Sequence, residues 1–210
     1  MCVLQKVFTG IRFSIFFIFL MFVSKVEANP YVMGADVFYQ CVGANQYEIT
    51  LMVYQDCQEP APPATQIINW TGSCGSGSIS VNLVSTTDLT PVCVSEQTTC
   101  QGGGGTFGVN QHIFTGIVNI PPNCGNVTIS WQTCCRNNAI TTLSGAGNTG
   151  LYIESVINTA ATPCNNTPVF DNVPFLFACR NSDVVYNHGG VDPDGDSLSY
   201  TLIDLSLIHI

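Results

Sequence analysis

Three aspartates, Asp192, Asp194 and Asp196, alternate with proline and glycine in the stretch VDPDGDSLSYTL (residues 191–202). Closely spaced carboxylates on a tight turn can direct several oxygens at one point, and calcium prefers six to eight oxygen ligands. An EF-hand is excluded because Ser197 stands where that loop needs its glycine. Two interpretations remain: a weak calcium site, making calcium the one candidate cofactor, or a Pro-Asp-Gly turn leading into a strand at residues 198–202.

Cysteine is the second residue type whose spacing carries chemistry. Eleven cysteines are present, and ten of them follow residue 28: Cys41, Cys57, Cys74, Cys93, Cys100, Cys124, Cys134, Cys135, Cys164 and Cys179. An even number in an exported chain predicts disulfides, with connectivity left open. Zinc is disfavoured because no C-x-x-C pair occurs.

Two details of the pairing follow from spacing. Cys93 and Cys100 are close enough in sequence to close a small loop. Cys134 and Cys135 are expected to pair with different partners, because neighbouring side chains on a strand point to opposite faces. The alternative for this pair is a thiolate activated by Arg136, which would also need a base.

The histidines that might supply such a base are His112 and His188. Neither lies in a recognisable catalytic motif, and both are expected to be solvent-exposed. His188 is also a candidate for lining a cation or glycan site, since it precedes the acidic stretch directly. No helix-borne metalloprotease motif and no nucleophile-elbow motif occurs in the sequence.

Residues 1–28 have the pattern of a secretory signal. Lys6 and Arg12 precede the apolar run FSIFFIFLMFV, and small residues then precede a cleavage point between Ala28 and Asn29. The apolar run is shorter than the roughly 20 residues that span a bilayer. We therefore expect a secreted or cell-surface protein with no stable membrane span in the mature chain; the alternative is an uncleaved N-terminal anchor.

Removing that signal makes the chain strongly acidic. Two basic and thirteen acidic residues remain, a formal net charge of −11, and no lysine follows Lys25. Such a surface repels phosphate backbones, which argues against nucleic acid as a partner and favours the attraction of cations.

The rest of the sequence is typical of strands. Apolar and polar residues alternate in YEITLMVY (47–54), SISVNL (78–83) and VTISWQ (127–132), and no convincing helical period follows residue 30. Many short strands between Gly, Pro and Asn turns predict an all-β fold, an antiparallel immunoglobulin-like β-sandwich with disulfides over residues 29–172.

Residues 173–204 are expected to start a second, truncated β-sandwich module with too few strands for its own core. Residues 205–210 are treated as a candidate non-native tail.

Two resemblances to known families add to this prediction of fold and domains. The acidic stretch resembles the start of bacterial cadherin-like and immunoglobulin-like repeats, which implies calcium at a domain edge. The runs at residues 35–57, 130–141 and 174–202, which include CVGANQYEITL and CCRN, resemble the N-terminal region of large gliding-motility-associated surface proteins. That family carries a C-terminal type IX secretion sorting domain, so the resemblance implies tandem β-sandwich modules, export and a role in adhesion or surface architecture.

The sequence thus predicts a non-enzymatic secreted or cell-surface modular protein whose partners are glycans or proteins on a surface. The rival from another class is a secreted hydrolase acting on polysaccharide. It would need a carboxylate pair about 5–10 Å apart, for which Asp171 and Glu154 are candidates. The third interpretation is a stalk module, which has no ligand of its own and only holds a distant binding domain away from the cell surface.

Overall fold

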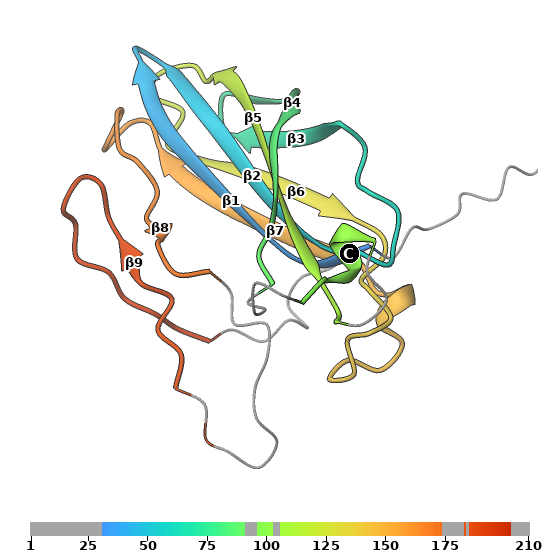
Figure 1. Cartoon of the computed structure of the whole chain (residues 1–210). Helices are drawn as coiled ribbons and strands as arrows, with labels where there is room; N and C mark the ends of the chain where they lie inside the picture. Colours follow the sequence, from blue (N-terminus) through green and yellow to red (C-terminus); the bar gives the residue numbers. More distant parts are fainter. Residues whose placement is uncertain (1–30, 91–95, 103–105, 174–182, 184, 203–210) are drawn as a thin grey trace, which may run out of the picture.

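The computed structural model describes residues 31–90, 96–102, 106–173, 183 and 185–202 (Figure 1). The predicted signal, the cleavage point at Ala28 and Asn29, the candidate tail, Cys93 and Cys179 lie outside the described residues. Within them the chain is all-β, with two short 3-10 helices, η1 (Thr99–Gln101) and η2 (Ala146–Asn148). The predicted fold class is confirmed at this level.

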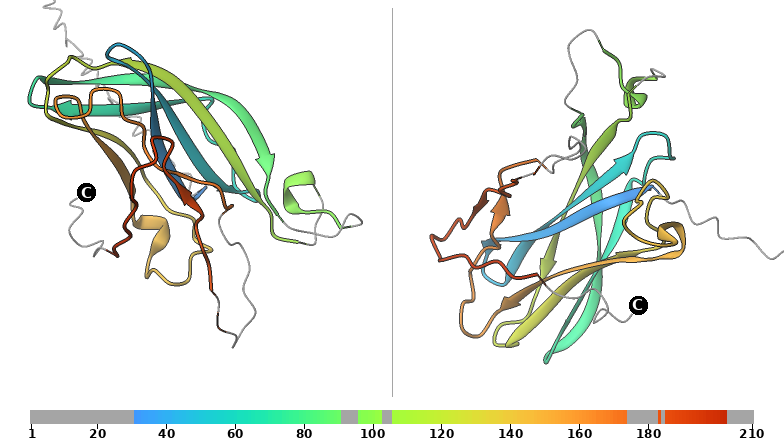
Figure 2. Two further views of the ribbon diagram at one scale, coloured as in Figure 1. Left: turned by 90° about the vertical axis from the view of Figure 1, so that its left-hand side faces the viewer. Right: turned by 90° about the horizontal axis from the view of Figure 1, so that it is seen from below.

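Seven strands form one continuous antiparallel sheet in the order β1-β2-β5-β4-β3-β6-β7. The sheet curls until it is nearly closed into a barrel (Figures 1 and 2). Two separate facing sheets of the immunoglobulin type are not observed. The strands are β1 (Val32–Gly43), β2 (Gln46–Asp56), β3 (Thr65–Gly72), β4 (Gly75–Asp88), β5 (Val109–Asn119), β6 (Asn126–Thr133) and β7 (Leu151–Asn158).

The predicted alternation places the core inside this barrel. Tyr47, Ile49, Leu51 and Val53 of β2 are at most 1% exposed, and their neighbours in sequence point outward, as period-two strands require. Val127, Ile129 and Trp131 of β6 repeat the pattern. In β4 the pattern weakens, because the pairing with β5 shifts register between Leu83 and Ser85 and leaves Leu83 38% exposed.

The two edge strands, β1 and β7, approach one another without forming a regular ladder. Since adjacent strands alternate in direction, the first and seventh strands run the same way. The Ser155 hydroxyl donates to the carbonyl of Val37 (2.6 Å), and the Tyr39 hydroxyl donates to the carbonyl of Val156 (3.2 Å). We call this junction the seam.

Residues 163–167, here called the strap, lie along the free edge of β1. The amide of Tyr39 donates to the Thr167 hydroxyl (2.9 Å), and the amide of Thr167 donates to the carbonyl of Tyr39 (3.0 Å). The amide of Cys41 donates to Oδ1 of Asn166 (2.8 Å). These partners run opposite to β1, and the next residue, Pro168, has no N–H with which to extend the pairing.

Beyond the strap, β8 (Val169–Phe170) pairs with β9 (Gly190–Val191) in a two-stranded sheet. Figure 2 shows this small sheet beside β1, and the rings of Phe38 and Phe170 meet edge to face with centroids 6.1 Å apart. The strand expected at residues 198–202 does not form, and Leu202 is fully exposed. That prediction was wrong because a strand needs a pairing partner, and none of the described residues supplies one.

Four disulfides join described cysteines: Cys41–Cys164, Cys57–Cys100, Cys74–Cys124 and Cys134–Cys135. The prediction of disulfides is confirmed, but both details of pairing were wrong. Cys100 joins Cys57, not Cys93, because the amide of Cys57 donates to the carbonyl of Gly108 (3.1 Å), beside Cys100. Cys134 and Cys135 join each other, because β6 ends at Thr133 and the alternation of a strand no longer separates them.

Loop length distinguishes these disulfides energetically. The Cys41–Cys164 bond closes a separation of 123 residues, whereas the Cys134–Cys135 bond closes a separation of 1. A Cys41→Ser/Cys164→Ser double variant should lose about 2–5 kcal/mol of unfolding free energy, and Cys134→Ser/Cys135→Ser about 1 kcal/mol. Urea denaturation of both variants measures the difference. Equal losses of unfolding free energy would contradict the larger stabilisation assigned to the Cys41–Cys164 bond.

Candidate functional site

The outer face of β1 and β2 carries a pocket lined by aromatic rings and a carboxylate. We call it the Asp36 pocket, and it encloses about 360 Å³ between the two strands and the segment that follows the strap. Its lining is Gly34, Ala35, Asp36, Tyr54, Phe170, Asn172, Tyr186 and His188. Asp36 and Tyr54 point outward because their neighbours Val37 and Val53 occupy the core.

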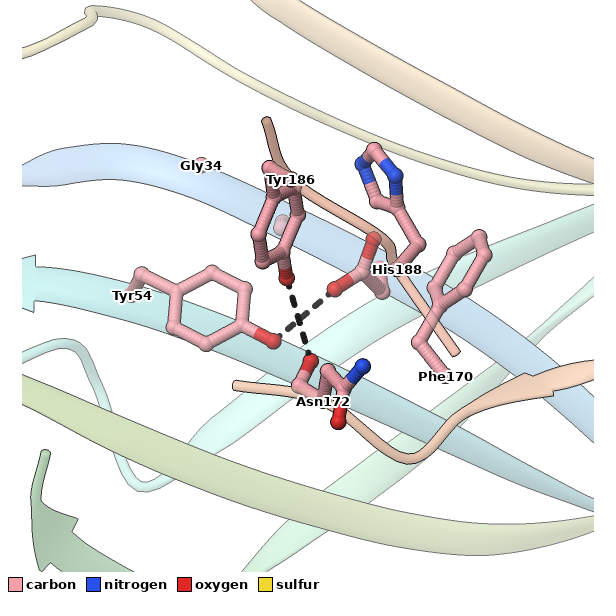
Figure 3. A pocket seen from close by; sticks show the side chains of 8 residues that line it. Gly34, Tyr54, Phe170, Asn172, Tyr186 and His188 are labelled. Atoms are coloured by element: carbon pink, nitrogen blue, oxygen red, sulfur yellow. Dashed lines mark hydrogen bonds between the residues drawn. The ribbon is translucent and has the colours of Figure 1, made fainter. Parts of the chain in front are cut away.

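Hydrogen bonds fix the polar groups of this pocket (Figure 3). The Tyr54 hydroxyl donates to Oδ2 of Asp36 (2.9 Å). The Tyr186 hydroxyl donates to the carbonyl of Val173 (2.8 Å) and also lies 3.3 Å from the carbonyl of Asn172. Both phenol rings are therefore held at their hydroxyl ends, which leaves the ring faces to form walls.

Aromatic rings enclose the remaining sides. The His188 ring lies 4.6 Å from that of Tyr186 and 5.3 Å from that of Phe170, measured between centroids. Figure 3 shows Tyr54 and Tyr186 on one side of the space and Phe170 on the other. His188 is exposed, as predicted, and it also contributes to a pocket.

Burial controls the electrostatics here. Desolvation raises the pKa of Asp36, while the Tyr54 hydrogen bond and the nearby His188 act in the opposite direction. Burial, together with the charge of Asp36, raises the pKa of Tyr54. The tyrosine thus stays protonated and donates to Asp36, whose carboxyl lies in a poorly solvated position.

A second hollow, the seam groove, adjoins this pocket and shares Ala35, Asp36 and Phe170 with it. It encloses about 460 Å³ where β1 and β7 are not bridged by the strap. Glu154 lines its far side and accepts a hydrogen bond from the Tyr152 hydroxyl (2.6 Å). Asp36 and Glu154, rather than the predicted pair Asp171 and Glu154, therefore flank one hollow.

The acidic stretch forms the turn that its Pro-Asp-Gly sequence predicts. Gly195 has a positive φ of 82° and donates its amide to the carbonyl of Asp192 (3.1 Å). Oδ1 of Asp192 accepts from the amides of Asp194 (2.8 Å) and Asp196 (3.2 Å). The carboxylate of Asp194 accepts from the amide (2.7 Å) and the side-chain amide (2.9 Å) of Asn166.

These three aspartates are thus used to shape the turn and to attach it to the strap. In the part of the chain that the structure describes, no three His, Cys, Asp or Glu side chains gather as a metal site. Calcium binding by Asp192, Asp194 and Asp196 stays a prediction.

His112 differs from its prediction, since it is only 3% exposed. Nε2 of Gln55 donates to the carbonyl of Glu59 (2.7 Å), so Oε1 of Gln55 is the acceptor that meets Nε2 of His112 (2.6 Å). Nδ1 of His112 then accepts from the Thr86 hydroxyl (2.9 Å). This arrangement uses both ring nitrogens of a neutral imidazole, and burial lowers the pKa of His112.

Comparison of the chain with protein-family models, with curated proteins and with solved structures finds no match. Among the helices in the described residues, none is long and apolar enough to cross a membrane.

Sequence reasoning found His188 but missed Asp36, Tyr54, Phe170 and Tyr186. One signal was available in the sequence. Asp36 is the one charged residue in the otherwise apolar run ADVFY, and a charge in such a run can mark a functional position. The partnership of Asp36 with residues 170–188 could not be found this way, because it depends on the path of the strap.

Removing the Asp194 attachment should loosen the turn. In Asp194→Ala the amide of Asn166 loses its acceptor, so its hydrogen exchange should become about two- to fivefold faster, as for an exposed charge-assisted bond. Asp196→Ala is the matched control, because Asp196 contributes its backbone amide to the turn. Exchange that is unchanged in Asp194→Ala would show that the turn is held by other contacts.

The buried histidine predicts a pH dependence of stability. Because the folded-state pKa of His112 lies below its ordinary value of 6.5, the unfolded chain binds the proton more tightly. Stability is then complete above about pH 6.5 and falls as the pH drops below it. Thermal melts of the protein and of His112→Gln between pH 7.5 and pH 5 should show a smaller decline in the variant; parallel declines would contradict the role of His112.

Proposed function

We propose that this protein is a non-enzymatic secreted or cell-surface module that binds glycans or proteins, in adhesion or surface architecture of gliding bacteria. The observation that carries the proposal is the Asp36 pocket, an open aromatic hollow with one carboxylate on the outside of a disulfide-clamped barrel. Ring faces beside a few fixed polar groups are typical of sites that bind a small ligand group.

The scaffold supports this proposal. Three disulfides span separations of 43, 50 and 123 residues, which suits an oxidising compartment outside the cell. Export through the type IX route, as part of a longer chain, and kinship with immunoglobulin-like or cadherin-like repeats belong to the same proposal and rest on the sequence resemblances.

A hydrolase acting on polysaccharide is the second candidate, favoured by a specific observation. Asp36, a carboxyl whose pKa burial raises, and Glu154 line the same seam groove. Glycosidases use a raised-pKa acid together with a second carboxylate in one cleft. The Asp36 pocket itself has one carboxylate in its lining, which is why binding is the primary proposal.

Adsorption to surface polysaccharides and whole bacterial cells tests the binding function. Tyr186→Ala should weaken adsorption about tenfold, because it removes one aromatic wall of the pocket. Thr65→Ala, on the exposed face of β3, is the control that should leave it unchanged. Adsorption that is equal in both variants would exclude the Asp36 pocket as the binding site.

Release of reducing ends from the same polysaccharides separates the two candidates. We expect none from the unmodified protein. Release that disappears in both Asp36→Asn and Glu154→Gln would instead establish the hydrolase.

A further inference from the structure

The Asp36 carboxylate has an unusual environment for a charged group. Its Oδ2 atom accepts from the Tyr54 hydroxyl, and the pocket around it is lined by rings, glycine, alanine and an asparagine, with no lysine or arginine. A hydroxyl hydrogen bond compensates a carboxylate only in part, and a charge removed from water gains strongly from a bound counter-charge.

The walls of the pocket favour the same kind of ligand. Tyr54, Phe170 and Tyr186 come from three separate segments and surround one space (Figure 3). The negative faces of aromatic rings attract an ammonium group within about 6 Å, and the attraction grows when water is excluded. A carboxylate at the base and rings at the sides are therefore complementary to an organic cation.

Among the described residues, His188 is the one basic side chain in the pocket lining. No lysine follows Lys25, and the guanidinium of Arg136 is directed elsewhere, since its Nε donates to the carbonyl of Gly150 (3.2 Å). The other arginine after residue 28, Arg180, lies outside the described residues. The formal charge of −11 after residue 28 also draws cations toward the surface.

We propose that the Asp36 pocket binds an organic ammonium group of the partner, paired with the Asp36 carboxylate and enclosed by Tyr54, Phe170 and Tyr186. The inference rests on the proposed binding function and names its ligand chemistry. Two sources carry this chemistry, the amino group of a deacetylated amino sugar and the side chain of lysine. The pocket volume of about 360 Å³ is in the range of small-ligand sites.

Calorimetric titration at pH 7 tests the inference with matched pairs of probes. The probes are glucosamine against N-acetylglucosamine, and Nα-acetyl-lysine amide against its Nε-acetylated form. We expect at least one amine to bind about tenfold or more tightly than its acetylated partner, and the tighter amine identifies the source.

Variants separate the charge from the rings. Asp36→Asn keeps an acceptor for Tyr54 but removes the charge, and it should weaken amine binding about tenfold or more. Phe170→Leu should weaken it about two- to fivefold, because it removes one aromatic wall of the pocket. Asp196→Asn, which removes a negative charge outside the pocket, is the control for long-range attraction, and unchanged thermal melts exclude unfolding.

Two outcomes would overturn the inference: amines and acetylated probes binding alike, or Asp36→Asn binding amines as well as the unmodified protein does. Its failure is distinguishable from that of the proposed function. Adsorption to cells that depends on Tyr186 but shows no preference for amines would leave the binding function standing. Selective amine binding without any adsorption would support the amine site and contradict the proposed function in adhesion.

Discussion

The attachment of the strap to the free edge of β1 is the contact on which the rest of this structure depends. A curled sheet of seven strands ends in two edges that run in the same direction, and exposed edges recruit other strands. Asn166 and Thr167 satisfy backbone amides of β1, and the Cys41–Cys164 bond fixes them there covalently. Part of the open side of the incomplete barrel is thereby protected.

The same contact produces both hollows. Because Pro168 ends the pairing, the chain leaves the edge of β1 and crosses its outer face, where Phe170 packs on Phe38. The part of the seam beyond the strap stays open as a groove, and the displaced chain becomes the outer wall of the Asp36 pocket. A single proline position therefore couples edge protection to the creation of a binding surface.

The sequence predicted what depends on local pattern. Alternation in YEITLMVY placed Tyr47, Ile49, Leu51 and Val53 in the core, and the Pro-Asp-Gly stretch formed a turn. It did not predict what depends on long-range pairing: the partner of Cys100, the burial of His112, and the meeting of Asp36 with Tyr186. These are set by barrel closure and by the path of the strap, which no short window of residues contains.

The Cys41–Cys164 bond also determines how mechanical load would travel through the protein. Tension applied at residues 31 and 202 enters along β1, passes through this covalent link and continues into the strap. Residues 42–163, which hold six of the seven barrel strands, lie outside that path. The Asp36 pocket lies against β1, which is part of the loaded path, whereas the Cys41–Cys164 bond shields the other six barrel strands from extension.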